Sequence, residues 1–328
     1  MGTPTATLIV NPASGHGRAG KLLPQVTLAL VRGLSEYTVQ VRATKDYAEA
    51  NQCAREAVLA ASGDNPAHPD MLLVMGGDGM ASVGLNACVG SNVRLGVIPA
   101  GTANDFCRGM GVPYTTIDAV KAVLAGYERL VDLTEVDGRL TGGEKRRYVG
   151  SVVSTGYDAK VNYRTNHRTV SLGSVSYTID ALAELARFKP LDYRVVIDGQ
   201  ALELPAMFIA VGNAGVFGGG MQVCPLADPT DGWLDITIAR PISRLGLLRL
   251  LPQMYSGAFA KDPCVELLRC REITIDGGNM FAMGDGEELG EVPLTARCRQ
   301  GALYLLGSTK PNPLALPPGV GAKLPGSA

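Results

Sequence analysis

The sequence predicts an α/β nucleotide-binding domain with a parallel, Rossmann-like sheet, followed by a second, mainly antiparallel β-sandwich domain. Two observations predict this fold class. In the first third of the chain, short apolar segments rich in β-branched residues alternate with helical segments; near residue 132 the pattern changes to strands joined by tight turns. Strands that are apolar throughout and separated by helices are typical of a parallel sheet covered on both faces.

The first domain, residues 1–132, is expected to contain four strand and helix pairs. The strands are expected at 7–10, 39–43, 71–75 and 95–98, and the helices at 20–31, 47–61, 82–88 and 106–110. Ligands of such sheets bind at the carboxyl ends of the strands. In this sequence those ends carry NPASG at 11–15, ATKD at 43–46, GGDG at 76–79 and PAGTAND at 99–105.

The second domain, residues 133–308, is expected to be an antiparallel β region with two helices. Its strands are expected at 148–153, 193–197, 207–211, 234–239, 272–275 and 303–306, and its helices at 175–188 and 244–255. Residues 309–328 form a Pro/Gly-rich tail, which is expected to be extended or mobile; packing back on the first domain is the alternative.

Composition restricts the function classes. The formal net charge of -1 argues against nucleic acid as the main partner, because the phosphate backbone is normally met by excess Lys and Arg. The 7 cysteines include no C-x-x-C pair, which favours reduced thiols over disulfides or a zinc site. No apolar run approaches the length of about 20 residues needed to span a bilayer. We expect a cytoplasmic protein whose membrane contact, if any, is peripheral.

Three strand ends of the first domain carry glycine turns, which let backbone N–H groups approach an anion at a helix start. The full Walker pattern G-x-x-x-x-G-K-[ST] is absent from the sequence. Asp78 and Asp105 would repel a phosphate directly. They make chemical sense with a divalent cation between carboxylate and phosphate; the alternative is that both are helix N-caps.

Several motifs, taken in order, match one family. NPxSG at 11–15, GGDG at 76–79 and PxGTxNDF at 99–106 resemble the catalytic region of the diacylglycerol kinase and sphingosine kinase superfamily, most closely its soluble bacterial lipid kinases. The resemblance continues with NA at 213–214, GGGM at 218–221, PxADxxDGxLD at 225–235 and GDGE at 284–287. It extends from about residue 7 to about residue 306.

The resemblance implies an ATP- and Mg²⁺-dependent lipid kinase that transfers the γ-phosphate to the hydroxyl of diacylglycerol and yields phosphatidic acid. A sphingoid-base kinase and an inactive nucleotide- or lipid-binding regulator are the alternatives. NAD kinases share the GGDG turn, but the later motifs fit the lipid kinases better. ATP and a membrane lipid are the implied partners, and the resemblance also suggests a homodimer.

The resemblance also assigns roles to residues. Asp285 would be the general base that takes the proton of the lipid hydroxyl, with Glu287 close by, and Asp78 and Asp105 would lie at the Mg-ATP and substrate site. Nucleotide contacts are implied for Asn11, Pro12, Ala13, Ser14, Gly15, Thr44, Gly76, Gly77, Asp78, Gly79, Met80, Thr102 and Asn104. Without the resemblance, the Asp285-Gly286 pair reads as a hairpin turn.

A second, structural Mg²⁺ site is implied at Asp228 and Asp231, with the backbone carbonyl of Trp233 as a further ligand. The same residues also read as a plain Asx turn.

The sequence departs from the family pattern after the GGDG turn. Met80 and Val83 stand where a hydroxyl and a carboxylate are usual, which bears on the catalytic rate.

Lipid access has two candidate surfaces. The segment 244–251 is apolar with two arginines, and basic residues gather at Lys145, Arg146, Arg147, Arg164, His167 and Arg168. Both could contact an anionic bilayer. For 244–251, a helix packed on the protein's own core is the favoured alternative.

Overall fold

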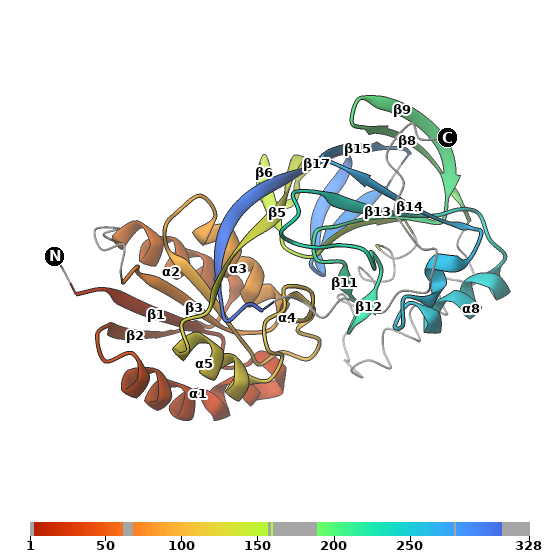
Figure 1. The fold of residues 1–328 in the computed structure, drawn as a ribbon. Coiled ribbons are helices and arrows are strands. Elements are labelled where there is room, and N and C mark those ends of the chain that lie inside the picture. The colour runs from red at the N-terminus through yellow and green to blue at the C-terminus, as the bar shows by residue number, and fades with distance from the viewer. Residues whose placement is uncertain (1–2, 62–67, 157–158, 160–188, 279, 310–328) are drawn as a thin grey trace. The chain divides into compact units, whose positions relative to one another are not determined.

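The computed structural model describes residues 3–61, 68–156, 159, 189–278 and 280–309 (Figure 1). The described chain divides into two units. The first is drawn from Met1–Asp132 and Gly301–Pro311, and the second from Leu133–Gln300. Two long strands, β5 (Glu128–Leu140) and β17 (Glu287–Leu306), contribute residues to both.

The first unit is built on a parallel sheet in which the strands follow the order β4-β3-β1-β2. The strands are β1 (Thr5–Val10), β2 (Thr38–Ala43), β3 (Met71–Gly76) and β4 (Arg94–Pro99). The helices are α1 (Ser14–Gly33), α2 (Tyr47–Ala60), α3 (Asp78–Cys88), α4 (Asp105–Gly109) and α5 (Thr116–Leu124). Helices α1 and α5 cover one face of the sheet and α2 and α3 the other (Figure 1). The predicted α/β fold is therefore confirmed.

The core of this unit lies on both faces of β3. Every residue of β3 is buried, which is what a central parallel strand covered on two faces requires. Leu8, Leu73 and Ile98 are fully buried in one cluster with Leu30 of α1 and Val123 of α5. Burial of such side chains contributes roughly 1.5–3 kcal/mol each.

The end of β17 differs from the sequence prediction. Residues 303–306 were predicted as a strand of the second domain, but Leu305 and Leu306 pair in parallel with Leu95 and Gly96 of β4. Leu305 is completely buried there. An apolar strand beside β4 covers a sheet edge that would otherwise expose unpaired backbone groups.

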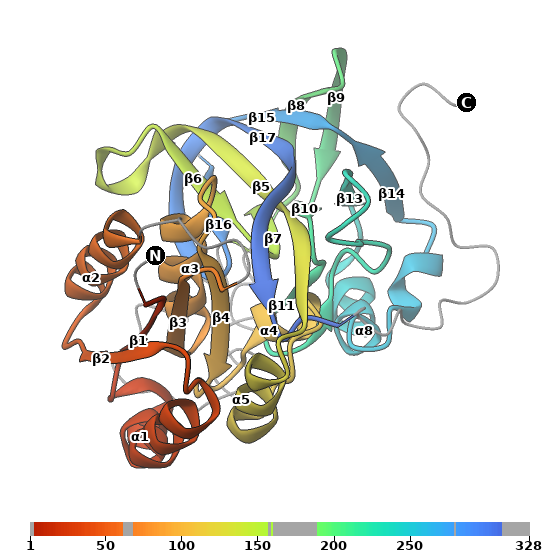
Figure 2. The same cartoon turned by 60° about the vertical axis from the view of Figure 1, so that its left-hand side comes forward.

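The second unit is a sandwich of antiparallel strands, which confirms the second half of the predicted fold. One layer has the order β14-β13-β10-β7-β16-β17. In the other, β17 pairs with β15 and β5, β15 with β8, β8 with β9, and β5 with β6 (Figure 2). Buried side chains of both layers, among them Val153, Ile209, Val195 and Ile273, share one hydrophobic cluster.

The remaining bounds in the second unit are as follows. The longer strands are β6 (Arg146–Val149), β7 (Val152–Gly156), β8 (Leu191–Ile197), β9 (Gln200–Ala206), β10 (Phe208–Gly212), β13 (Leu234–Ala239), β14 (Val265–Cys270), β15 (Glu272–Asp276) and β16 (Phe281–Gly284). A short hairpin pairs β11 (Val216–Phe217) with β12 (Met221–Gln222). The helical segments are η1 (Thr141–Gly143), α8 (Arg244–Gln253) and η2 (Ala258–Lys261).

Two predicted features lie outside the described residues: the helix at 175–188, and the tail apart from Thr309. The basic residues Arg164, His167 and Arg168 lie outside them as well. Within the described ranges, no helix is long and apolar enough to cross a membrane.

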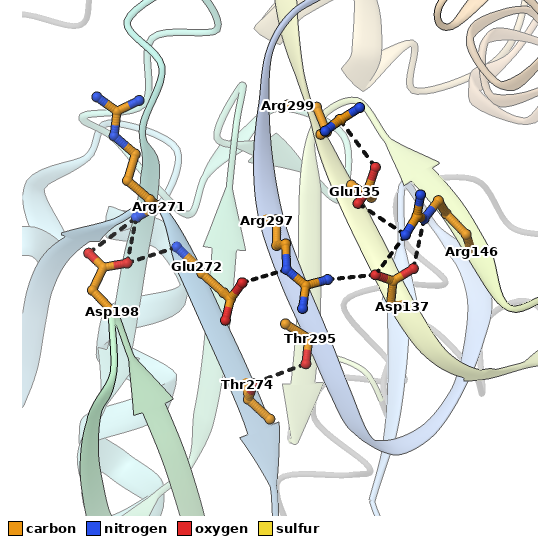
Figure 3. A network of polar contacts seen from close by, with 10 residues as sticks. All are labelled: Glu135, Asp137, Arg146, Asp198, Arg271, Glu272, Thr274, Thr295, Arg297 and Arg299. Atoms are coloured by element: carbon orange, nitrogen blue, oxygen red, sulfur yellow. Dashed lines mark hydrogen bonds and ion pairs between the residues drawn. The ribbon is translucent and has the colours of Figure 1, made fainter.

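A network of ion pairs joins four strands of the second unit (Figure 3). The Arg297 guanidinium of β17 lies between the carboxylates of Asp137 on β5 and Glu272 on β15. Arg146 of β6 adds an ion pair of 2.8 Å to Asp137 and one of 3.5 Å to Glu135. The hydrogen bond from Arg146 and the nearby Arg297 hold the pKa of Asp137 below its usual range.

We expect Arg297→Gln to lower the free energy of unfolding by about 1 kcal/mol, because Arg297 connects two carboxylates at once. The matched control is Arg194→Gln. Arg194 forms a single 3.7 Å pair with Glu203, and both side chains are more than 70% exposed, at 73% and 79%. We expect a loss below about 0.5 kcal/mol for the control. Urea unfolding measures both; equal losses would contradict the network's role.

Candidate active site

The loop after β1 is fixed by its own backbone. The Asn11 side chain accepts a hydrogen bond of 3.0 Å from the Ala13 N–H, and the Asn11 carbonyl accepts one of 3.0 Å from the Ser14 N–H. The Gly20 N–H donates to the Pro12 carbonyl at 3.0 Å. These bonds hold the loop tightly against the first turn of α1.

Helix α1 begins irregularly, because Gly15, His16 and Gly17 all have left-handed backbone conformations with φ of 60°, 58° and 81°. Gly15 also lies against the loop after β4: a Cβ atom there would be 2.1 Å from the Ala100 carbonyl oxygen. Only glycine fits this position, both for its φ and for this close approach.

The loops after β3 and β4 lie in direct backbone contact. A Cβ atom on Gly101 would lie 2.3 Å from the Gly77 Cα. The Gly76 carbonyl accepts hydrogen bonds from Ala100 N–H at 2.7 Å and from Gly101 N–H at 3.0 Å. The structure therefore brings together the predicted loops 11–15, 76–80 and 101–105 at one edge of the first unit's sheet.

Asp78 acts as a cap for a helix other than its own. Its Oδ1 accepts a 2.9 Å hydrogen bond from the Phe106 N–H, in the first turn of α4. Neither aspartate is the N-cap residue that the sequence offered as an alternative, because the N-cap of α3 is Gly77 and that of α4 is Asn104. The adjacent Asp105 is buried, with 8% of its surface exposed.

The loop after β4 is shaped by Asn104. This residue has a left-handed backbone with φ of 54°, and its side-chain amide spans Gly101: Oδ1 accepts from the N–H at 3.0 Å, and Nδ2 donates to the carbonyl at 3.2 Å. Thr102, between them, is exposed. Of the two residues of this loop that were predicted to contact a nucleotide, Asn104 is buried and holds the loop together. Thr102 is exposed and accessible to a ligand.

The side chains of Met80 and Thr44 are buried, whereas a direct contact with a nucleotide would need them to be exposed. The Met80 side chain is 6% exposed and packs on Gly76, where a Cβ would be 2.4 Å from the Met80 Cγ. Val83 is completely buried. Thr44 is 2% exposed and its hydroxyl donates to the Val10 carbonyl at 3.2 Å. The two departures from the family pattern thus place apolar side chains in the core.

Arg18 lies three residues after the NPxSG motif, and the sequence makes Arg18 or Lys21 the candidate cation for a phosphate. Its guanidinium donates to the Ala100 carbonyl at 3.3 Å and to the Gly101 carbonyl. It therefore fastens α1 to the loop after β4. Which carbonyls Arg18 meets depends on tertiary structure, so these contacts could not be predicted from the sequence.

In the second unit, Asp285 occupies a left-handed turn with φ of 50° between β16 and β17. Its carboxylate accepts three backbone hydrogen bonds, from Gly150 at 2.7 Å, Ser151 at 2.8 Å and Val152 at 3.3 Å. The carboxylate is thereby held in one orientation. The predicted base and the predicted hairpin turn are thus compatible roles of the same residue.

Glu287 begins β17, two residues after Asp285, and is partly buried. Burial raises the pKa of its carboxyl group, and the nearby Arg147 opposes this rise. The raised pKa makes this carboxyl group easier to protonate than an exposed glutamate.

The predicted metal ligands lie beside an arginine. Asp231 Oδ1 accepts from the Trp233 N–H at 3.0 Å, and Asp231 Oδ2 pairs with Arg269. Arg269 also pairs with the buried Asp235 at 3.1 Å. Asp228 Oδ1 accepts hydrogen bonds from the Thr230 N–H and hydroxyl, as an Asx turn does. Among the described residues, no cluster of three or more His, Cys, Asp or Glu suits a metal ion.

Comparisons with known proteins agree with these features. Residues 5–136 match the diacylglycerol kinase catalytic domain, and residues 151–307 match the YegS C-terminal NAD kinase beta sandwich-like domain. A protein named diacylglycerol kinase from Mycobacterium tuberculosis is 36% identical over 284 residues, which cover 85% of this chain and 88% of that protein. A Bacillus subtilis protein of the same name is 26% identical, covering 88% of this chain and 91% of that protein.

The chain belongs to the diacylglycerol kinase family. It is therefore a kinase, and its fold agrees with solved structures. A diacylglycerol kinase from Bacillus anthracis has a TM-score of 0.70 at 20% identity, covering 92% of this chain and 96% of that one. Yeast NADH kinase, solved with NADH, has a TM-score of 0.51 at 12% identity, covering 94% and 85%.

In this kinase, Gly101→Ala should lower the free energy of unfolding by more than about 2 kcal/mol, because the new methyl group would overlap the Gly77 backbone. Gly126→Ala is the matched control. It has φ of 71° and open space around a Cβ, so it should cost only about 1 kcal/mol. Chemical denaturation measures both. A Gly101 variant no less stable than the control would show that the two loops separate at little cost.

The kinase should also show a pH dependence from Asp235. Burial raises the pKa of this carboxyl to about 6, although Arg269 opposes the rise. Because the folded state then binds the proton more tightly than the unfolded state, the contribution of Asp235 to stability falls as pH rises from about 4 to about 6.

Urea unfolding of the wild type and of Asp235→Asn across this range isolates that contribution. We expect the stability of the wild type, relative to the variant, to decrease with rising pH. A difference that does not change with pH would contradict the assignment.

Proposed function

We propose that this kinase is an ATP- and Mg²⁺-dependent diacylglycerol kinase whose product is phosphatidic acid. The observation that carries the proposal is the convergence of three glycine-containing strand-end loops, with Asp78 between them, at one edge of a parallel sheet. The name of the 36% identical relative favours diacylglycerol as the acceptor.

The nucleotide half of the site would be the loops 11–15, 76–80 and 102–104. The first turn of α3 is the positive end of the helix, which favours phosphate. Gly76, Gly77 and Gly79 leave that backbone without side chains in the way. Met80 would contribute through its backbone only, since its side chain is buried.

Mg²⁺ fits the donor chemistry at the start of α3 and α4. Asp78 and Asp105 offer carboxylate oxygens, which a hard cation prefers. When bound, the ion would neutralise charge on the phosphoryl group that is transferred. The bond to Phe106 fixes the Asp78 carboxylate in place, so this residue would bind without prior reorganisation.

In the proposed reaction, the acceptor hydroxyl oxygen forms a bond to the γ-phosphorus while the bond from that phosphorus to the bridging oxygen of ADP breaks. The hydroxyl proton would pass to the Asp285 carboxylate. Three backbone N–H groups orient this carboxylate, and Glu287 would be the second acid-base group of the turn.

A sphingoid-base kinase has the same chemistry with a different alcohol. The reading of the chain as an inactive regulator depended on Met80 and Val83. Both side chains are buried. The loop therefore still offers its backbone to a phosphate, whichever side chains stand at these two positions.

A transfer assay with labelled ATP tests the proposal. The acceptors would be diacylglycerol, a sphingoid base and a simple long-chain alcohol, each in mixed micelles. We expect Mg²⁺-dependent label in phosphatidic acid. Transfer only to the sphingoid base would establish the alternative, and ATP binding without any transfer would overturn the kinase proposal.

Asp285→Asn should lower the turnover number at least about a hundredfold and leave ATP affinity nearly unchanged, because it removes the proton acceptor. Asp198→Asn is the matched control. Asp198 also has a left-handed backbone, with φ of 46°, and its carboxylate accepts 2.9 Å hydrogen bonds from the Arg271 and Glu272 N–H groups.

The control distinguishes the loss of a proton acceptor from the loss of the hydrogen bonds that hold a turn. We expect Asp198→Asn to lower stability while keeping the turnover of the remaining folded protein. An Asp285→Asn variant that keeps substantial turnover would refute the base assignment.

Structural Mg²⁺ binding by Asp228, Asp231 and the Trp233 carbonyl stays a prediction. If the site binds the ion, Mg²⁺ should raise the melting temperature of the wild type without nucleotide, and this rise should be absent in Asp228→Asn. No rise in either protein would leave Arg269 as the cation that balances Asp231 and Asp235.

A further inference from the structure

Helix α8 presents apolar side chains outward as well as inward. Leu245 is 80% exposed and Leu248 is 41% exposed, and Pro252 is exposed on the next turn. Positions i, i+3 and i+7 of a helix share one face. Tyr255, 52% exposed, follows just beyond the helix end. We call the exposed residues Leu245, Leu248, Pro252 and Tyr255 the outer face of α8.

The segment that carries the outer face is basic. Residues 241–261 contain Arg244, Arg249 and Lys261 and no Asp or Glu. All three cations are exposed. Arg249 also pairs at 3.1 Å with Asp262, the first acidic residue after this segment. An apolar helical face flanked by Arg and Lys is complementary to the boundary of an anionic lipid bilayer.

The opposite face of α8 packs on the unit that carries Asp285. Leu250 and Met254 are buried in one cluster with Val152, the first residue of β7. The Val152 N–H donates to the Asp285 carboxylate at 3.3 Å. The same helix therefore contributes buried side chains to the cluster that contains Val152 and presents an apolar face outward.

We propose that the outer face of α8 is the surface by which this kinase docks on an anionic bilayer. The proposal rests on the proposed function, since a lipid acceptor resides in a membrane. Leucines and Tyr255 would enter the boundary between headgroups and acyl chains, while Arg244, Arg249 and Lys261 contact anionic headgroups. The docked kinase would take diacylglycerol from the bilayer without leaving it between turnovers.

Vesicle sedimentation tests the docking directly. Full-length protein is mixed with vesicles of phosphatidylcholine alone or of phosphatidylcholine with phosphatidylglycerol. We expect binding to the anionic vesicles, weakened by salt, and a loss of at least about tenfold in affinity for the double variant Leu245→Gln, Leu248→Gln. The matched control is Leu59→Gln on α2, at an equally accessible leucine, 85% exposed.

Two measurements of turnover distinguish a failure of the docking proposal from a failure of the proposed function. The double variant should lose turnover with diacylglycerol in vesicles and keep it with a short-chain diacylglycerol dispersed as monomers. If the wild type phosphorylates neither, the proposed function fails while the sedimentation result still decides the docking.

Three outcomes would overturn the docking proposal. They are absence of wild-type binding to anionic vesicles, equal binding by the double variant and the Leu59 control, and a wild-type dimer in analytical ultracentrifugation that the double variant dissociates. The last would assign the outer face to a second copy of this chain.

Discussion

The backbone contact between Gly77 and Gly101 is the constraint on which the assembly of the strand-end loops, and with it the proposed nucleotide site, depends. Two strand-end loops approach so closely that a single methyl group at Gly101 would overlap the Gly77 Cα. Because the loops touch, Asp78 can reach the first turn of α4, and the Gly76 carbonyl can accept two N–H groups from the neighbouring loop. The glycines therefore allow the loops to assemble.

The second unit uses carboxylates to hold backbone in much the same way. Asp285 and Asp198 each occupy a left-handed turn and accept N–H groups from a neighbouring segment. What distinguishes them is the surrounding chemistry: Glu287, whose carboxyl pKa is raised by burial, follows Asp285 on the same turn. A residue can thus be required both for the architecture of a turn and for the reaction proposed there, and the two roles need separate readouts.

The sequence predicted the fold class and the strand-end loops because both are encoded locally. Uniformly apolar segments such as 71–75 specify buried parallel strands, and glycine turns at three of the four predicted strand ends indicate the edge at which ligands of such sheets bind. The burial of Met80 could not be predicted in this way. Its direction depends on the exact start of α3 at Asp78, four residues before the predicted start.

Contacts between residues far apart in the sequence could not be predicted from local patterns either. Nothing near Asp231 in the sequence indicates that Arg269 balances its charge, and the apolar segment 303–306 gives no sign that it joins β4 rather than the sandwich. Helix α5 was missed because the segment 116–124 follows a short loop rich in turn residues. Each of these features is set by which elements meet in the folded chain.

Backbone hydrogen exchange with and without Mg-ATP tests the central claim most directly, because the claim concerns particular backbone segments. The account predicts slowed exchange on nucleotide binding at residues 13–17, 77–80 and 101–105, the three loops joined by the Gly15, Gly77 and Gly101 contacts. ATP binding that leaves exchange in all three segments unchanged would contradict it.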